Sequence, residues 1–279
     1  MTPAQTVLVK NDELFAHDLS GQPYDQPREI SQYLLTHFGS FGDLFGRPGH
    51  PLGAAYGYPH RLSAVLRAAA ETAGVTVRRA LDVGCNVGGL SVQAACWVED
   101  LVLGVDLSPR AIQVARSVVR HGGGVFSVME SGPFTRQVEI RLPVGAVRAR
   151  LEFAVADAGE LACLPASIAA GGFDAVLLSN VLDRVDDPVG CLRQFASTDR
   201  ILTAGGLLLV ACPWSWYPRF SHPGSWLGSD HGLDSGSALR RLLAQDFDLI
   251  CERDEPGVLR HNPREYDYFE SQVTVWRKR

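Results

Sequence analysis

Residues 80–89 read ALDVGCNVGG, and this stretch decides the fold. The apolar run Ala80–Val83 predicts a buried strand, and a helical pattern follows over Gly88–Val98. The glycines between them let the backbone turn sharply and approach a ligand closely. Their spacing is Gly84-x-x-x-Gly88-Gly89 and not the GxGxxG of dinucleotide sites, so we expect a ligand-binding turn for a different ligand.

Short apolar runs alternate with helical patterns along the rest of the chain. Runs this continuous fit strands buried on both faces of a parallel sheet, with the helices as crossovers. The expected strands are Ala80–Val83, Leu101–Asp106, Leu151–Val155, Phe173–Ser179 and Gly206–Cys212, closed by Phe247–Arg253 and Ser271–Arg277. The expected helices are Gly88–Val98, Pro109–His121, Pro188–Leu202 and Ser237–Gln245, the last after a Trp- and Pro-rich loop over residues 213–233. The sequence predicts an open, Rossmann-like α/β fold.

The first 75 residues have a different character, with no strong strand signal. Two helical patterns, Pro27–Phe38 and Pro59–Ala73, each open with a proline, which suits the first turn of a helix. Gly39–Gly57 between them is rich in Gly and Pro and is expected to be loop. We therefore predict an N-terminal helical cap over residues 1–75 and one ligand-binding unit over residues 76–279.

Composition excludes several classes of protein. The 279 residues carry a net charge of −5 without a basic run, so we expect neither a nucleic-acid partner nor a membrane surface. No apolar stretch is long enough to span a bilayer, and Met1–Lys10 has no secretory pattern. Six scattered cysteines without a CxxC pair indicate reduced thiols and a cytoplasmic protein. We expect no metal site, and the sequence leaves the oligomeric state open.

Three acids stand at the ends of consecutive predicted strands, where ligands bind in this kind of sheet. Asp82 precedes the first glycine, where a carboxylate repels a pyrophosphate and attracts an ammonium. Asp106 ends the next strand, where a carboxylate accepts hydrogen bonds from two ribose hydroxyls. Asp157 follows the third strand, where a polar side chain can meet an adenine amino group. Alone, Asp106 also fits the approach to a helix N-cap at Ser108, Asp157 fits the cap of a short helix, and the glycine turn fits a plain strand-to-helix connection. Together they fit S-adenosylmethionine.

The segment Ala80–Gly88 resembles the first motif of class I S-adenosylmethionine-dependent methyltransferases. That resemblance implies a seven-stranded, mostly parallel sheet whose last strand is antiparallel, and S-adenosyl-L-methionine as cofactor. The expected cofactor-binding residues are Asp82, Gly84, Cys85, Asn86, Gly88, Asp106, Leu107, Asp157, Ala158, Ser179 and Asn180.

From Tyr24 onward the chain is similar to a narrower family, the C-terminal methyltransferase domain of ovothiol-biosynthesis enzymes, which methylate a mercaptohistidine. The matching segments are QYLLTHFG at 32–39, GYPHR at 57–61, the long insertion 122–150, NVLDR at 180–184, SW at 215–216, WLG at 226–228, RHNPR at 260–264 and VTVWR at 273–277. The chain departs from the family at Asp183 and at residues 265–268, EYDY. The iron-dependent sulfoxide synthase that usually precedes the domain is absent from this sequence, so the acceptor is expected to be a sulfur-bearing histidine made elsewhere, or another amino acid.

The expected acceptor pocket lies where the strand ends meet the cap and the 213–233 loop. Arg260 or Arg264 is expected to bind a carboxylate, Asp183 an ammonium or an azole N–H, and the aromatic residues, Trp214 and Trp216 included, to stack on a ring. The candidate catalytic residues are Tyr33, His37, Asn180, Asp183, Arg260, Tyr266 and Tyr268. Alternatively Tyr33 is a core aromatic, His37 caps a helix end and Asp183 forms a surface pair with Arg184.

The function expected from the sequence is methyl transfer to a small molecule, first of all to a ring nitrogen of an ovothiol-type amino acid. A neutral ring nitrogen needs no strong base, so the chemistry consists mainly of proximity and orientation. The alternatives are an O- or S-methyltransferase for another natural product, a nicotinamide-dependent oxidoreductase, and a binding module that keeps the fold without activity.

Overall fold

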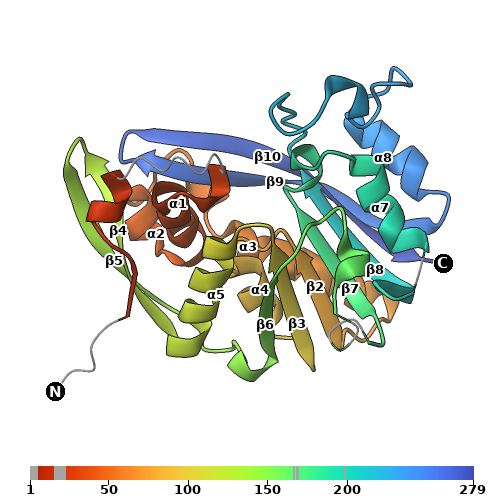
Figure 1. Cartoon of the computed structure of the whole chain (residues 1–279), viewed down its shortest axis with the longest axis horizontal. Helices are drawn as coiled ribbons and strands as arrows, with labels where there is room; N and C mark the ends of the chain where they lie inside the picture. The colour runs from red at the N-terminus through yellow and green to blue at the C-terminus, as the bar shows by residue number, and fades with distance from the viewer. Residues whose placement is uncertain (1–5, 16–22, 166, 168–169, 198) are drawn as a thin grey trace.

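A seven-stranded sheet forms the centre of the computed structural model, which describes residues 6–15, 23–165, 167, 170–197 and 199–279 (Figure 1). Its strand order is β6-β3-β2-β7-β8-β10-β9. The parallel strands are β2 (Arg79–Val83), β3 (Leu101–Asp106), β6 (Leu151–Val155), β7 (Phe173–Ser179) and β8 (Leu202–Cys212). β10 (Glu265–Lys278) runs antiparallel to β8, and β9 (Phe247–Asn262) runs antiparallel to β10. This confirms the predicted fold.

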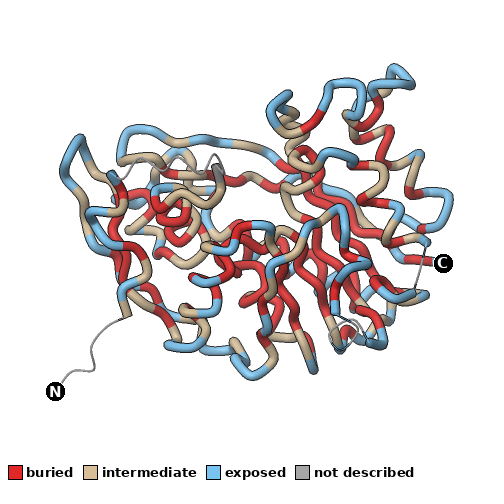
Figure 2. The backbone as a smooth tube through the Cα atoms, viewed as in Figure 1, coloured by how far each residue is buried: buried red, intermediate tan, exposed pale blue. Residues whose placement is uncertain are grey.

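Helices cover both faces of the large sheet. Because successive side chains of a strand point to opposite faces, Ala80 packs with one helical layer while Leu81 and Val83 pack with the other. The first layer holds α3 (Tyr58–Ala73), α4 (Gly89–Ala94) and α5 (Pro109–His121); the second holds α7 (Pro188–Ser197) and α8 (Ser235–Leu243). Figure 2 shows the buried backbone concentrated in these strands.

A second, three-stranded sheet lies beside α5 in the order β1-β4-β5. The insertion forms its hairpin, β4 (Gly123–Ser131) and β5 (Phe134–Arg141), and β1 (Val7–Val9) pairs in parallel with β4. The sequence predicts none of these three strands: β1 is too short to show a period, and residues 122–150 are identified only as a long insertion. Together with α1 (Pro27–Phe38) and α2 (Phe41–Phe45), this sheet encloses a third apolar cluster.

The two closing strands form a hairpin much longer than predicted. It runs along the top of Figure 1, over α1 and α2, toward the β4–β5 hairpin. Thr36 Oγ1 donates to the carbonyl of Val258 at 3.2 Å, and the Arg260 guanidinium lies 2.8 Å from the carboxylate of Glu130 on β4. The outer half of the hairpin therefore depends on contacts with distant segments, which a local sequence pattern does not record.

Some boundaries differ from the prediction. α2 lies in the segment expected to be loop, because Ser40 and Asp43 form a capping box at its start. α4 ends at Ala94 and α7 at Ser197, both earlier than expected, and β8 begins at Leu202. The 3-10 turns are Asp12–Phe15, Pro23–Asp25, Gly53–Ala55, Arg148–Arg150, Leu161–Cys163, Leu182–Arg184 and Pro223–Ser225.

The proposed division at residue 75 remains a prediction. α3 belongs to the predicted cap by sequence and packs in the same apolar cluster as α4 and the large sheet. Residues 1–5 and 16–22 of that cap lie outside the described part of the chain. Among the described residues, no helix has the length and apolar character that crossing a membrane requires.

Candidate active site

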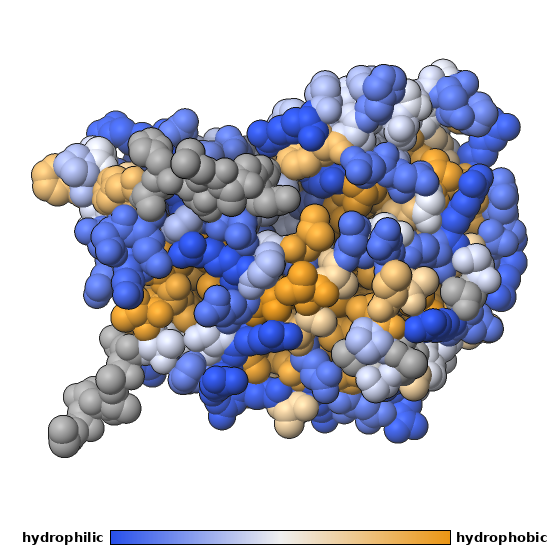
Figure 3. Space-filling view, in the orientation of Figure 1, coloured by the Kyte–Doolittle hydropathy of each residue, from blue (hydrophilic) through white to orange (hydrophobic). Residues whose placement is uncertain are grey.

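A cavity of about 1030 Å³ opens at the carboxyl ends of the parallel strands. Its walls come from the strand ends, from α1 and the start of α3, from the loop after β8 and from β10. Figure 3 shows apolar side chains gathered across the middle of the face turned to the viewer. Exposed Leu107 follows β3, and exposed Val155 ends β6. Ligand pockets commonly occupy roughly 300–1,000 Å³, so this one lies at the upper end of that range.

The glycine-rich turn forms one end of the cavity. Gly84 has a φ of +74°, and a Cβ on it would lie 2.2 Å from Val181, so only glycine fits this position. Gly84 and Cys85 donate their N–H groups to the carbonyl of Val105 and line the cavity. Gly88 does not line it; its φ of +85° and its contact with the Phe153 ring make it a packing residue.

Asp82 lies buried at this end and lines the cavity. Its Oδ2 accepts a hydrogen bond from Ser91 Oγ at 2.6 Å. Burial, with a smaller contribution from the charge of Asp106, raises the pKa of Asp82 from 3.8 to about 7, and the Ser91 bond only partly opposes this. Burial disfavours the ionised form of Asp82, so a cation beside the carboxylate would stabilise that form.

Asp106 lies at the next strand end and organises the turn. It accepts hydrogen bonds from the backbone N–H groups of Asn86 and Ser108, both at 2.8 Å. Burial raises the pKa of Asp106, although these two donors act against the shift. Beyond it, Leu107, Asp157 and Ala158 line the cavity, and exposed Asp157 accepts a bond from the Gly159 N–H at 2.7 Å.

Tyr33 and His37 line the cavity from α1. The Nδ1 atom of His37 accepts a hydrogen bond from the Gly89 N–H at 3.1 Å, so the cap helix is joined directly to the glycine-rich turn. Burial lowers the pKa of His37 to about 4. The imidazole is therefore neutral at pH 7 and, with Nδ1 as acceptor, carries its proton on Nε2.

Asn180 follows β7 with a φ of +56° and lines the cavity together with Ser179. Its Oδ1 accepts from Tyr58 Oη at 3.2 Å and from Ser271 Oγ at 2.8 Å, and Tyr58 Oη lies 2.9 Å from Ser271 Oγ. These contacts fix the orientation of the amide and leave its NH₂ group as the donor end. Burial raises the pKa of Tyr58 to about 12, so the hydroxyl keeps its proton.

The structure does not bring several predicted acceptor residues to the cavity: Trp214, Trp216 and Arg264 do not line it, and neither do Asp183 and Arg260. Asp183 is fully buried, accepts from the backbone N–H and the hydroxyl of Ser215, and pairs with Arg184 at 3.0 Å. Arg260 is buried against Glu130, because the long hairpin carries it past the strand ends to the second sheet. Both side chains stabilise surrounding segments, and neither lines the cavity.

The hairpin contributes the predicted Tyr266 and Tyr268 to the wall. Tyr266 Oη donates to the carbonyl of Leu44 at 3.2 Å, whereas exposed Tyr268 pairs with Glu270 at 2.7 Å. Several wall residues are absent from the predicted set: Tyr24, Tyr58, Arg184, Tyr217, Arg219 and Phe220. Tyr58 and Arg184 stand in segments that carry the resemblance, while the irregular loop around Tyr217 offered no periodic signal.

The chain matches the family model described as methyltransferase domain over residues 55–251, which is more than half of its length. N-methyltransferase NodS from Bradyrhizobium japonicum WM9, solved with S-adenosyl-L-homocysteine, is 13% identical with a TM-score of 0.49, covering 87% of this chain and 98% of that one. The PH0226 protein from Pyrococcus horikoshii OT3 is 16% identical with a TM-score of 0.47, covering 80% and 91%.

A curated relative matches a short segment only. The 7SK snRNA methylphosphate capping enzyme of Mus musculus is 47% identical over 45 residues, which are 16% of this chain and 7% of that protein.

Proposed function

The chain belongs to the S-adenosylmethionine-dependent methyltransferase family, and on that premise we propose that it methylates a ring nitrogen of a small, histidine-derived amino acid of the ovothiol type. The observation that carries this proposal is the shape of the cavity. One end is acidic and glycine-lined, the other is lined by aromatic side chains together with His37 and Asn180, and both belong to a single space of about 1030 Å³.

The residues at the acidic end fit the cofactor. Asp82 is buried and its pKa is raised to about 7, a state in which an amino-acid ammonium would supply a cationic partner. Asp106 is in place to accept from ribose hydroxyls, and Leu107, Asp157 and Ala158 form the wall proposed for the adenine. Gly84 has no Cβ, and one added at its positive φ would lie 2.2 Å from Val181, which also lines the cavity.

When bound, S-adenosylmethionine supplies a methyl group on a sulfonium, and the neutral thioether left behind retains the electron pair of the broken bond. An acceptor nitrogen forms the new bond with its own lone pair, and the other ring nitrogen releases a proton to water. The contribution of this chain is to hold the two molecules in line, which is worth up to about 7–11 kcal/mol in favourable cases.

Neither His37 nor Tyr58 offers a strong base beside the proposed acceptor, which supports nitrogen rather than oxygen as the accepting atom. A hydroxyl acceptor needs a base, but the pKa of His37 is lowered to about 4 by burial, and Tyr58 keeps its proton because its pKa is raised to about 12. A neutral ring nitrogen reacts without such a base. The His37 Nε2–H and the Asn180 NH₂ group are the donors proposed to orient the acceptor through its other polar atoms, because the lone pair of the attacking nitrogen must stay free.

A mass-spectrometric screen of methyl acceptors tests the proposal. The panel contains sulfanylhistidines, histidine, other amino acids, catechols and thiols, incubated with the protein and S-adenosylmethionine. We expect one methyl group on a ring nitrogen of an azole amino acid, located by NMR. Methylation confined to hydroxyl or thiol acceptors would make the protein an O- or S-methyltransferase instead. S-adenosylmethionine should raise the melting temperature and NADH should not.

A further inference from the structure

The acceptor end of the cavity contains a small group of cationic and aromatic side chains that the sequence-based interpretation did not identify. We call Tyr24, Arg184, Tyr217, Arg219 and Phe220 the cationic–aromatic corner. The guanidinium of Arg184 lies 4.9 Å from the centre of the Tyr217 ring and 5.3 Å from that of Phe220, and Tyr24 stacks on Phe220 at 5.9 Å. All five residues line the cavity.

Arg184 holds this corner in place with donors that are already engaged. It donates to Tyr24 Oη at 2.9 Å, to the Ser215 carbonyl at 2.7 Å and to Ser215 Oγ at 2.9 Å, and it pairs with Asp183 at 3.0 Å. Its charge is thus neutralised by a buried carboxylate, so Arg184 is a positioning residue.

Arg219 stacks on the same two rings as Arg184, with its guanidinium 4.7 Å from the centre of Phe220 and 5.2 Å from that of Tyr217. Unlike Arg184, it has no carboxylate partner or hydrogen-bond acceptor within the described residues. Stacking uses the flat face of a guanidinium and leaves the donors at its edge free. Two such donors match the two oxygens of a carboxylate.

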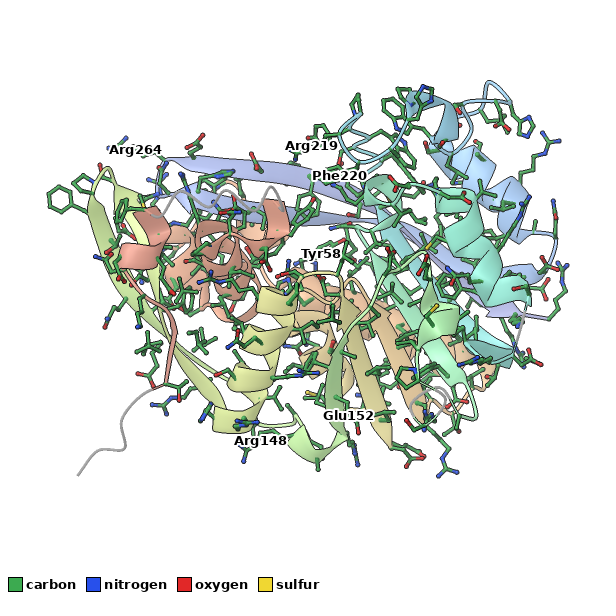
Figure 4. All side chains as sticks on the ribbon, in the orientation of Figure 1. Tyr58, Arg148, Glu152, Arg219, Phe220 and Arg264 are labelled. Atoms are coloured by element: carbon green, nitrogen blue, oxygen red, sulfur yellow. The ribbon has the colours of Figure 1, made fainter. Side chains whose placement is uncertain are left out.

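The position of Arg219 also indicates how an acceptor would be oriented between the corner and the glycine-rich turn. Aromatic rings lead from the corner to the glycine-rich turn: Phe220 stacks on Tyr24, Tyr24 lies 6.4 Å from Tyr33, and Tyr33 lies 5.8 Å from His37, which contacts Gly89. Figure 4 shows Arg219 and Phe220 on the loop above Tyr58, whereas Arg264 lies at the far end of the hairpin.

The other charged residues of the wall make the corner selective. In the described part of the chain, seven of them are acidic: Asp82, Asp106, Asp157, Glu160, Asp186, Asp187 and Asp267. These carboxylates repel an anionic acceptor. Arg219 attracts it, whereas the charge of Arg184 is already paired with Asp183.

Resting on the proposed methyl transfer, we propose that Arg219 binds the carboxylate of the acceptor at the cationic–aromatic corner, so that the substrate is a free aromatic or azole carboxylic acid whose ring lies along Tyr24 and Tyr33. The carboxylate then points toward the loop after β8, and the methylated atom points toward His37 and the glycine-rich turn. Esters and amides of the same acids are poor acceptors.

The test compares each acid with its own amide. Histidine and histidinamide, and tryptophan and tryptophanamide, are titrated into protein saturated with S-adenosylhomocysteine and followed by saturation-transfer NMR. We expect the unmodified protein to bind at least one acid about tenfold more tightly than its amide, and Arg219→Gln to bring that ratio close to one. Arg219→Lys should recover part of it, since the charge remains and the paired donors are lost.

Arg148→Gln is the matched control, because Arg148 is exposed and lies on the opposite side of the molecule in Figure 4. S-adenosylhomocysteine affinity, measured by calorimetry, should be the same in all four proteins. The proposal is overturned if none of the acids binds, if no acid binds more tightly than its amide, or if Arg219→Gln keeps the preference. An acceptor screen without any product would refute the proposed methyl transfer, while the acid-to-amide ratio would still decide the role of Arg219.

Discussion

The two ends of the cavity are built in different ways. At the glycine-rich end, the polar groups come from two adjacent strands and the turn between β2 and α4, and their partners are mostly backbone N–H groups. At the acceptor end, Tyr33, Asn180, Arg219 and Tyr268 come from a helix, a strand end, a loop and a hairpin that are far apart in the chain. On the proposed assignments, cofactor binding depends on the ends of neighbouring strands, and acceptor selection depends on how distant segments pack.

Their electrostatics differ as well. Asp82 and Asp106 are buried carboxylates whose pKa values are raised by burial, which prepares this end for a cation and for hydroxyl donors. The cationic–aromatic corner offers a guanidinium stacked on rings near the surface. Changes at the first end should therefore alter cofactor affinity whatever the acceptor, and changes at the second should alter acceptor choice alone.

Gly84→Ala should have the largest effect on ligand binding. The new Cβ would lie 2.2 Å from Val181 at a φ of +74°, so the turn must move and cofactor binding should be lost. Strain and overpacking together should lower the free energy of unfolding by ~2–4 kcal/mol, measured by urea denaturation.

Gly132→Ala is the control for backbone strain alone. Gly132 has a φ of +54°, and a Cβ added to it would meet nothing within 4 Å, so this substitution should cost only about 1 kcal/mol. Equal losses of stability in the two variants would show that close packing at Gly84 is unimportant.

Asp106→Ala should weaken S-adenosylhomocysteine binding by ~1–3 kcal/mol in calorimetry, since two ribose hydroxyls would lose a charged acceptor. Asp100→Ala removes the same charge near the opposite end of β3, where Asp100 pairs with Arg78 at 2.8 Å in solvent. It should leave the affinity unchanged. An Asp106→Ala protein with unaltered affinity would refute the ribose assignment.

Asp82 should make cofactor binding depend on pH by about tenfold between pH 6 and 8. Its pKa is raised to about 7 in the free protein, and an ammonium favours the ionised form, so affinity should rise as pH rises through 7. Calorimetry at several pH values measures this, and Asp82→Asn should bind weakly without the dependence.

The raised pKa of Asp82 should make the stability of the folded protein fall with rising pH, whereas it makes cofactor affinity rise. A carboxyl whose pKa is raised on folding binds more protons in the folded state, so its contribution to stability falls as pH rises from about 4 to 7. In urea denaturation, Asp82→Asn should remove that fall in stability.

A wild-type cofactor affinity that does not change from pH 6 to 8 would contradict the assignment of Asp82 to the ammonium.

The contrast between the two ends also explains what could be predicted from the sequence. Strands β3, β6 and β7 and helix α5 were predicted with their observed ends, because continuous apolar runs and the Ser108-Pro109 helix start are local signals. Asp82 and Asp106 line the cavity as expected, because the end of a parallel strand fixes their place. Their assignment to cofactor groups is still a prediction.

The acceptor end could not be predicted in the same way. Arg219 lies in a loop without periodicity, and Arg260 lies in a hairpin whose length depends on contacts with α1 and β4. Local patterns do not record such contacts, so the sequence points to Arg260 beside a motif and not to Arg219, which lines the cavity.

Arg260→Ala should therefore have the smallest effect on the reaction. Arg260 is buried, pairs with Glu130 at 2.8 Å, and does not line the cavity, so its loss should lower the free energy of unfolding by ~1–3 kcal/mol. The KM of the acceptor should change by less than about twofold, since no transition-state or ground-state contact is removed. Arg260→Lys separates charge from geometry: it should regain part of the stability, because an ammonium still reaches a carboxylate that also pairs with Arg136. A large rise in KM without loss of stability would return the carboxylate contact to Arg260, and it would mean that the hairpin moves toward the strand ends when the acceptor binds.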